Sequence, residues 1–438
     1  MNRKYIQNFR ERFFDYRVMK QLFSIFRSIL PLLIILIFSA RPLSAGKYDQ
    51  VDRHVENIPA FTDNDLLKLT HYLVNPFDQQ EEKVRAIYHW ITTNIDYDIV
   101  AYRNRSESVT EPAKILETRK CVCGGYANLF KKMAELAGME AEFIPGYSKG
   151  YNYQMGKLFD EDNMHAWNAV RIDGQWRLLD ATWGAGYIDD NQQFVRSVND
   201  YYFLTPPEQF IQSHYPKDIP WQLLDRKVSR REFEESAFVK PTFFAYALET
   251  VSHEKYRIES GHSLQIKLEG PPDVQLVAQI LHGDSKQDQE LTFVQRNGKY
   301  FEIDAVFPYT ATYILRLYAR RENESDQFIW VMDYQVEASA RGHQILGYPE
   351  IYSDFIDHQA YLYTPLERRL SNGKQVNFKI RVKDAEQVAV IYNDRFTFLK
   401  RSGDHFEGPV IIQPGDQFLA AQFPGSKYFQ YLLRYVGW

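Results

Sequence analysis

The sequence predicts an α+β domain followed by two all-β domains of the sandwich type. Three observations support this prediction. Apolar residues recur at three- and four-residue steps over residues 63–97 and 124–138, as they do in helices. Residues 165–183 contain two strand-like runs joined by an Asp-Gly pair. After about residue 225 the helical pattern fades, and short alternating segments follow at the spacing of sandwich strands.

The composition excludes several classes of function. Hydrophobic residues make up 45% of the 438 residues, so the chain can bury ordinary cores. Its length fits about two to four domains. A net charge of −5 argues against nucleic-acid binding, which needs a basic patch. The sequence has no phosphate-binding glycine loop and no zinc-type cysteine pairs, and we predict neither a cofactor nor a metal site.

The first 45 residues have the order of an export signal. Basic residues are scattered over residues 1–20, an apolar run follows at 29–38, and small residues close the segment at 39–46. The apolar run is too short to span a bilayer comfortably. We therefore predict cleavage after Ala45 and export to the periplasm, the cell surface or the extracellular space. An uncleaved N-terminal anchor is the alternative, and membrane contact is expected only through it.

The elements of the first domain are expected in the following order. Residues 63–74 and 81–95 predict two helices, with Asp63 and other acidic residues near the helix starts. Residues 124–138 predict a third helix that ends at a glycine. A strand is expected at 141–147, and the hairpin of residues 165–183 follows it.

Two sandwich domains of about 100 residues each are expected after this region. An Asn297-Gly298 pair predicts a hairpin turn within the first of them, and residues 339–347 have the character of a linker. The domains are predicted at 1–45 (signal or anchor), 46–228 (α+β domain), 229–341 (first β domain) and 342–438 (second β domain). Strands are predicted at 263–270, 274–281, 291–303, 312–320, 327–338, 375–382, 387–394 and 396–408.

The Asp173-Gly174 turn predicts the register of the first domain's hairpin. Counting outward from the turn places His165 opposite Thr182, with Asp180 on the same face. The Cα atoms of His165 and Asp180 would then lie about 7–8 Å apart, within reach of a side-chain contact. An aspartate that accepts from one imidazole nitrogen fixes the tautomer and leaves the other nitrogen free as a base.

Cys121 and Cys123 are the only two cysteines, and they precede a Gly-Gly pair. A disulfide between them would close no useful loop. We predict that Cys123 is a nucleophile, because a helix start favours the thiolate and offers a backbone N–H to an oxyanion. Gly124 and Gly125 are expected to let a peptide backbone approach. Cys121 is the second choice as nucleophile, and burial of both thiols as small hydrophobic side chains is the structural alternative.

For several neighbouring residues we favour a structural interpretation. Trp90 could donate to an oxyanion, but its place in a predicted helix favours core packing. Trp167 and Trp183 flank the presumed site, and packing is favoured over a role in lining a substrate groove. The acidic loop at 159–163 is expected to be solvated rather than to bind a cation. His214 is expected to be a turn residue.

The segments "CVCGGYA", "HAW" and "DATW" in this order resemble the transglutaminase-like superfamily of papain-type folds. The resemblance implies that Cys123, His165 and Asp180 form a catalytic triad. Residues 81–98 are similar to the helix that leads into this core. Residues 201–224 and the two β domains resemble the kyphoscoliosis peptidase branch of the superfamily.

The resemblance implies a papain-like (transglutaminase-like) core followed by two immunoglobulin-like sandwiches. It also implies an exported cysteine-dependent acyl-transfer enzyme, a peptidase or amidase that acts on protein or peptide amides through a thioester on Cys123. A cell-envelope protein is one possible substrate. A protein-crosslinking transglutaminase and a weakly catalytic binding scaffold at the cell surface are the alternatives. The sequence departs from the family at Cys121, where a small residue is usual, and this thiol would add redox sensitivity.

Overall fold

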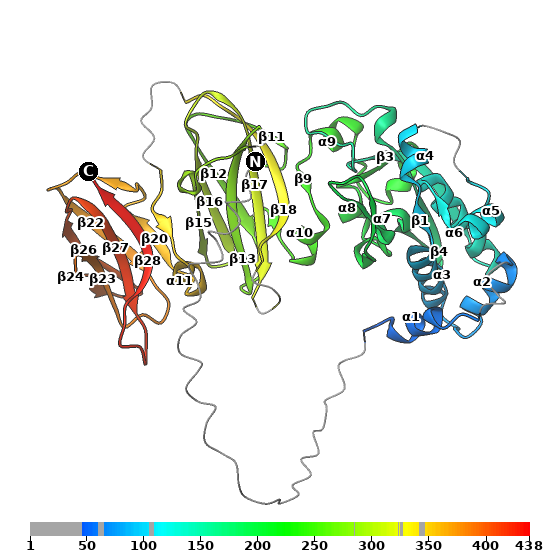
Figure 1. Cartoon of the computed structure of the whole chain (residues 1–438), viewed down its shortest axis with the longest axis horizontal. Helices are drawn as coiled ribbons and strands as arrows, with labels where there is room; N and C mark the ends of the chain where they lie inside the picture. The colour runs from blue at the N-terminus through cyan, green and yellow to red at the C-terminus, as the bar shows by residue number, and fades with distance from the viewer. Residues whose placement is uncertain are drawn as a thin grey trace, which may run out of the picture. The chain divides into compact units, whose positions relative to one another are not determined.

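A computed structural model describes residues 46–59, 65–104, 109–283, 285–322, 324, 327–340 and 347–438. The signal or anchor predicted at 1–45 lies outside these residues. The described residues contain three large hydrophobic cores, one in the helix-rich region drawn blue to green and one in each β region, drawn green to yellow and orange to red (Figure 1). Among the described residues, no helix is long and apolar enough to cross a membrane.

The three predicted helices are present in the first region. They are α2 (Leu66–Val74), α3 (Gln80–Asn94) and α6 (Cys123–Leu136). Asp65 caps α2 by accepting from the backbone N–H of Lys68 at 3.0 Å, whereas Asp63 lies outside the described residues. Residues 84–92 of α3 are all buried, so this helix forms the centre of the core. Three shorter helices accompany them: α1 (Asp49–Glu56), α4 (Ile99–Asn104) and α5 (Pro112–Thr118).

A four-stranded sheet packs against α6 and carries most of the candidate site. Its strands, in the order β5-β4-β3-β8, are β5 (Gln175–Leu179), β4 (Met164–Ile172), β3 (Ala141–Ser148) and β8 (His214–Pro216). The side-chain amide of Asn168 in β4 donates to the carbonyl of Ala127 in α6 at 3.0 Å. The same amide donates to the carbonyl of Glu142 in β3, so one buried side chain joins helix and sheet.

The hairpin between β4 and β5 has the predicted turn. Asp173 and Gly174 both have positive φ angles, 48° and 80°, as a two-residue turn of this kind requires. The predicted register holds from the turn outward until Asn168 pairs with Leu179. The predicted pairing of His165 with Thr182 is wrong, because β5 ends at Leu179.

The hairpin ends early because the next residue begins a helix. Asp180 accepts hydrogen bonds from the backbone N–H groups of Thr182 and Trp183, at 2.8 and 3.1 Å. An aspartate side chain that accepts in this way offers the backbone a helix start in place of a strand ladder. The short helix α7 (Ala181–Ala185) follows, where the sequence had predicted a strand.

The first β region is a two-sheet sandwich. One sheet has the order β10-β12-β16-β15, and the other has β11-β18-β17-β13-β14 with β9 also paired to β18. The observed turn lies one residue later than the predicted Asn297-Gly298 pair, because Asn297 is still paired with Tyr300. The strands are β9 (Phe238–Val239), β10 (Glu249–Thr250), β11 (Arg257–Ser260), β12 (Ser263–Glu269), β13 (Val274–His282), β14 (Ser285–Lys286), β15 (Thr292–Asn297), β16 (Tyr300–Val306), β17 (Ala311–Arg321) and β18 (Ile329–Ala338).

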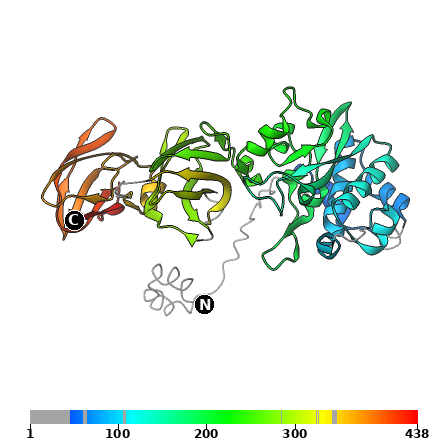
Figure 2. The ribbon, with the colours of Figure 1, turned by 90° about the horizontal axis from the view of Figure 1, so that it is seen from above.

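The second β region has the same two-layer construction (Figure 2). Its sheets have the orders β19-β28-β27-β23-β24, with β21 also paired to β28, and β20-β22-β26-β25. The predicted fold class, an α+β core followed by two immunoglobulin-like sandwiches, is confirmed. The strands are β19 (Glu350–Ile351), β20 (Tyr361–Thr364), β21 (Arg369–Leu370), β22 (Gln375–Arg381), β23 (Gln387–Tyr392), β24 (Arg395–Phe398), β25 (Lys400–Ser402), β26 (His405–Ile411), β27 (Gly415–Gln422) and β28 (Gln430–Gly437).

A buried lysine joins the sheet to the segment that leads into the first β region. Lys149 follows β3 and is 4% exposed. Its ammonium group donates to the carbonyl and the hydroxyl of Ser236, at 2.9 and 2.7 Å, directly after α9 (Arg230–Glu235). The ring of Phe233 lies 4.9 Å from the same nitrogen. Burial lowers the pKa of Lys149 to about 7, because the charged form loses its hydration.

The stability of the fold should therefore depend on pH through Lys149. An unfolded lysine, with a pKa of 10.5, binds a proton that the folded protein lacks between pH 7 and pH 10.5. The wild-type free energy of unfolding should gain up to about 1.4 kcal/mol per pH unit from this group as the pH rises through that range. Lys149→Met should lack this gain. Urea unfolding of both proteins from pH 6.5 to 9.5 measures the difference, with the exposed Lys217→Met as control. A difference that stays constant with pH would contradict the assignment.

Candidate active site

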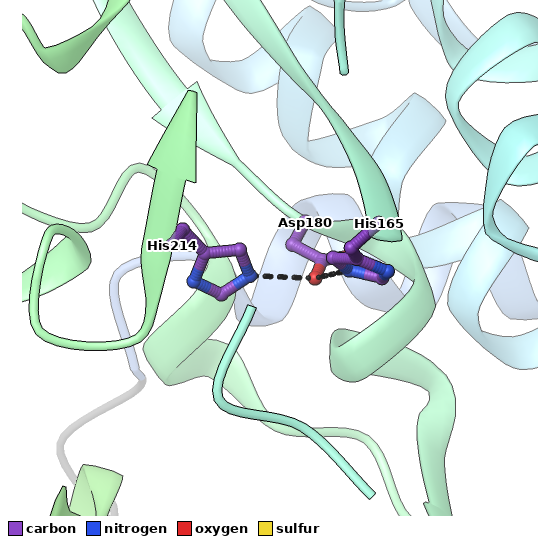
Figure 3. A group of neighbouring side chains, drawn as sticks. All are labelled: His165, Asp180 and His214. Atoms are coloured by element: carbon purple, nitrogen blue, oxygen red, sulfur yellow. Dashed lines mark hydrogen bonds and ion pairs between the residues drawn. The ribbon is translucent and has the colours of Figure 1, made fainter. Parts of the chain in front are cut away.

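His165 and Asp180 are brought together by the hairpin and the helix that interrupts it. His165 lies near the start of β4, and Asp180 lies between β5 and α7. The Nε2 atom of His165 is 2.7 Å from Oδ2 of Asp180. Figure 3 shows the carboxylate of Asp180 between this ring and the ring of His214. The predicted contact of the two side chains is confirmed, although Asp180 reaches His165 from a helix cap and not from a paired strand position.

The carboxylate of Asp180 is fully buried and accepts four hydrogen bonds. Oδ1 takes the two backbone N–H groups at the start of α7, and Oδ2 takes the imidazoles of His165 and His214. Burial alone would raise the pKa of Asp180, but the two imidazoles outweigh burial and lower it. Asp180 is therefore a fixed, ionised acceptor.

His165 has one nitrogen bound and one nitrogen available. Because Nε2 donates to Asp180, the neutral ring carries its hydrogen there and leaves Nδ1 as an acceptor. Burial disfavours the imidazolium, but Asp180 and the interaction with the Cys123 thiol outweigh burial and raise the pKa of His165. The indole ring of Trp183 stacks on His165 with a centroid distance of 5.2 Å. This arrangement suits a base that must take up and return a proton.

The two thiols lie in different environments. Cys123 is the first residue of α6, is partly exposed and lines the same cleft as His165. Its backbone N–H has no acceptor within the helix because it belongs to the first turn. Cys121 ends β2 (Lys120–Cys121), pairs with Tyr97 of β1 (Asp96–Tyr97) and is 0% exposed. Burial raises the pKa of the Cys121 thiol, so this residue has the character of a core side chain.

The two glycines after the thiols differ as well. A Cβ on Gly125 would lie 2.5 Å from Cβ of Cys121 and 2.8 Å from the carbonyl oxygen of Val109. A Cβ on Gly124 would meet no atom within 4 Å. We expected both glycines to admit a substrate backbone. Gly125 is instead required by the packing of Cys121, and only Gly124 borders open space.

The cleft that holds Cys123 and His165 has a volume of about 700 Å³. Two tyrosines of the lining are influenced by the thiol. Burial raises the pKa values of Tyr97 and Tyr102, and the charge of Cys123 adds to both shifts. The first β region also contributes to the lining through Lys240 and Trp330. The lining of the cleft therefore includes several aromatic side chains and is not made by the α+β domain alone.

The remaining candidates divide between core and cleft. Trp90 is 0% exposed and belongs to the main core, and Trp167 is 1% exposed in a small core of its own. Trp183 lines the cleft, against our expectation of packing alone. In the acidic loop, Asp160 caps a short helical turn, while Asp162 faces the cleft.

His214 is the residue that the sequence did not identify. We expected a turn residue, but His214 lies in β8 and its Nε2 atom is 3.1 Å from Oδ2 of Asp180. Strand β8 is three residues long and is defined by its pairing with β3. A segment this short shows no periodic pattern from which a strand could be predicted. Tyr97 and Tyr102 were missed for a similar reason, because they lie in short elements ahead of α6.

In the described part of the chain, one group of side chains could hold a metal ion, and it consists of His165, Asp180 and His214. The ligand atoms of His165, Asp180 and His214 all lie within 4.8 Å of one another. Hydrogen bonds already account for their positions, because Asp180 accepts from both rings and from two backbone groups. We therefore treat the group as a hydrogen-bonded cluster.

Two family models match this chain. Residues 68–181 match the transglutaminase-like superfamily, and this range includes Cys123, His165 and Asp180. Residues 230–349 match the KY-like, immunoglobulin-like domain. The roles predicted for the three side chains stay predictions, which the geometry described above makes testable.

Curated relatives and a solved structure are similar to parts of this chain. Kyphoscoliosis peptidase of Mus musculus is 32% identical over 318 residues, which are 70% of this chain and 47% of the relative. Kyphoscoliosis peptidase of Homo sapiens is 34% identical over 300 residues, which are 68% of this chain and 44% of the relative. The chain thus spans about half the length of these relatives. The crystal structure of a TGase aligns with a TM-score of 0.23 and 18% identity, covering 38% of this chain and 40% of that one.

The contrast between the two glycines can be tested by stability. Gly125→Ala should destabilise the protein by about 1–3 kcal/mol, because its Cβ would overlap Cys121 and the backbone of Val109. The matched control Gly124→Ala should be neutral or stabilising by less than about 1 kcal/mol, because its Cβ enters open space within a helix. Thermal and urea unfolding measure both changes. Equal effects of the two substitutions would contradict this account of the turn.

Proposed function

We propose that this chain, whose residues 68–181 match the transglutaminase-like superfamily, is a cysteine-dependent acyl-transfer enzyme that hydrolyses protein or peptide amides. The observation that carries the proposal is the 2.7 Å contact between His165 Nε2 and Asp180 Oδ2 on the cleft that Cys123 lines. A nucleophile, a base and a group that orients the base are the parts such chemistry requires. The word peptidase in the names of the two relatives fits the proposal.

The first half of the reaction forms a thioester. Nδ1 of His165 takes the proton of the Cys123 thiol, and the sulfur attacks the carbonyl carbon of the amide. The carbonyl oxygen becomes an oxyanion that the backbone N–H of Cys123 can bind. The C–N bond then breaks, and His165 gives its proton to the leaving amine. Asp180 stabilises the imidazolium throughout, because its buried carboxylate stays ionised.

The second half releases the acyl group. His165 takes a proton from water, the resulting hydroxide attacks the thioester carbon, and the thiolate leaves as the carboxylic acid forms. His165 then returns its proton to the thiolate, which restores the starting state. An amine in place of water would give a new amide, which is the transglutaminase outcome. We propose water because the relatives carry the name peptidase, and analysis of the products formed with and without an added amine distinguishes the two acceptors.

The lining of the cleft favours a polypeptide substrate. Tyr102, Trp183 and Trp330 offer flat apolar faces, and Asn152 donates to the hydroxyl of Tyr102 at 2.7 Å, which fixes that ring. Lys240 adds a cation to the lining of the cleft. We propose a protein or peptide of the cell envelope as the substrate class. A scaffold that only binds such a partner is the competing proposal, and it predicts no reactive thiol.

We further propose that the enzyme works outside the cytoplasm. The support is the basic, apolar and small-residue order of residues 1–46.

The two thiols should react differently with a thiol-directed probe. Cys123→Ala should abolish labelling by iodoacetamide and any acyl transfer, because Cys123 is the partly exposed thiol next to His165. The matched variant Cys121→Ala should retain most of both, because Cys121 is buried and its thiol has a raised pKa. Mass spectrometry of the labelled peptides between pH 5 and pH 9 identifies the site.

Two labelling results would contradict the proposed enzyme. If Cys121→Ala silences labelling while Cys123→Ala does not, the assignment of the nucleophile is wrong. If both thiols react slowly and only above about pH 8.5, neither is activated and the scaffold proposal is favoured.

Export predicts a mature protein that begins near Gly46. Amino-terminal sequencing of the purified protein and fractionation of the producing cells measure this directly. Replacing the apolar run at 29–38 with polar residues should keep the protein in the cytoplasm with its amino terminus intact. An intact amino terminus on wild-type protein in the soluble cytoplasm would refute the proposal.

A further inference from the structure

We propose that His214 is a positioning residue that holds Asp180 in the orientation in which it binds His165. The inference rests on the proposed function and adds a fourth member to the Cys123, His165 and Asp180 group. Its basis is the 3.1 Å contact between Nε2 of His214 and the same carboxylate oxygen, Oδ2, that His165 binds (Figure 3).

The hydrogen-bond partners of His214 define its tautomer. A carboxylate can only accept, so Nε2 of His214 must carry a hydrogen to bind Asp180. The other nitrogen, Nδ1, lies 2.8 Å from the hydroxyl of Ser213, which can donate to it. A neutral imidazole with one donor and one acceptor nitrogen satisfies both contacts.

The surroundings of His214 favour this neutral form. The residue is 1% exposed, and its ring stacks on Phe210 at 4.0 Å and lies 4.4 Å from the ring of Trp183. The titratable groups that face it are Asp180, His165 and Tyr202. Burial and the charge of His165 outweigh the pull of Asp180 and lower the pKa of His214 to about 4.

A neutral donor suits the task better than a cation would. A lysine or arginine at this place would neutralise Asp180 and weaken its attraction for the imidazolium of His165. A neutral imidazole donates a hydrogen bond and leaves the negative charge of Asp180 for His165. The strand β8 that carries His214 is paired to β3, and β3 is paired to the strand of His165, so both rings are held by one sheet.

The loss of this bond should act through Asp180. Without His214, Oδ2 would keep one partner in a buried site, and the carboxylate would be freer to rotate and easier to protonate. The His165 imidazolium would then lose its counter-charge at a higher pH than in the wild type. The acid limb of any reaction that needs the thiolate of Cys123 should therefore move toward neutral pH.

The experiment measures the rate of alkylation of Cys123 by iodoacetamide from pH 4 to pH 9 in the full chain. His214→Phe keeps an aromatic ring against Phe210 but removes the donor, and His214→Gln keeps a donor near the position of Nε2. We expect His214→Phe to lower the rate about tenfold on the acid limb, the usual size for a lost hydrogen bond to a charged group. The rate above pH 8 should change by less than twofold, and His214→Gln should restore most of the loss.

A double-mutant cycle separates positioning from a general loss of structure. If His214 acts through Asp180, His214→Phe should have less than a twofold effect in an Asp180→Asn background, where the carboxylate is already lost. Equal effects in both backgrounds, or an unchanged acid limb in His214→Phe, would overturn the inference.

A measurement on the wild-type protein covers the case in which the variants do not fold. Imidazole nitrogen spectra of histidine-labelled protein should show His214 neutral, with its hydrogen on Nε2, from pH 5 to pH 8. The opposite tautomer, or a charged ring, would overturn the inference. One equivalent of metal retained by the purified protein and lost in His214→Gln would also overturn it, in favour of a metal site.

The two proposals fail in different ways. If wild-type Cys123 shows no selective reaction, the proposed function fails, while the nitrogen spectra still decide the state of His214. If Cys123 reacts selectively but His214→Phe leaves its pH profile unchanged, the inference alone fails.

Discussion

The carboxylate of Asp180 is the point at which the chain's local folding and the geometry of the site meet. One of its oxygens caps α7 by accepting from Thr182 and Trp183, and the other accepts from His165 and His214. The cap ends strand β5 and begins a helix. That helix in turn carries Trp183, whose ring lies against both imidazoles. A buried carboxylate is costly unless all its acceptor positions are used, and here four donors use them.

The hairpin could be predicted because its signals are local. The Asp173-Gly174 pair adopts the positive φ angles that a two-residue turn requires, and the turn fixes the pairing up to Leu179. The end of the strand could not be predicted in the same way. Asp180 is equally acceptable as a strand residue that faces a histidine and as a helix cap, and as a cap it accepts from the N–H groups of Thr182 and Trp183. The contact with His165 survives because both alternatives place the carboxylate near the same ring.

His214 lay beyond sequence-based inference because its contact with Asp180 depends on tertiary structure. It is 34 residues from Asp180 and lies in a three-residue strand that is defined only by its pairing with β3. Periodicity needs longer segments before it indicates a strand. The cleft lining from the first β region, at Lys240 and Trp330, depends on tertiary structure for the same reason. The three candidate side chains Cys123, His165 and Asp180 could therefore be predicted from motifs, whereas the groups that position and enclose them could not.

The two cysteines differ because a change of backbone conformation separates them. Cys121 ends strand β2 and pairs with Tyr97. Its buried side chain occupies the space that a Cβ atom on Gly125 would need. Two residues later, at Cys123, the helix begins, and Cys123 lines the cleft that holds His165. The small size of cysteine suits Cys121 because a larger side chain would collide with α6, and its burial keeps it from competing as a nucleophile. Two thiols separated by a single residue can therefore differ, with only one of them exposed to the cleft.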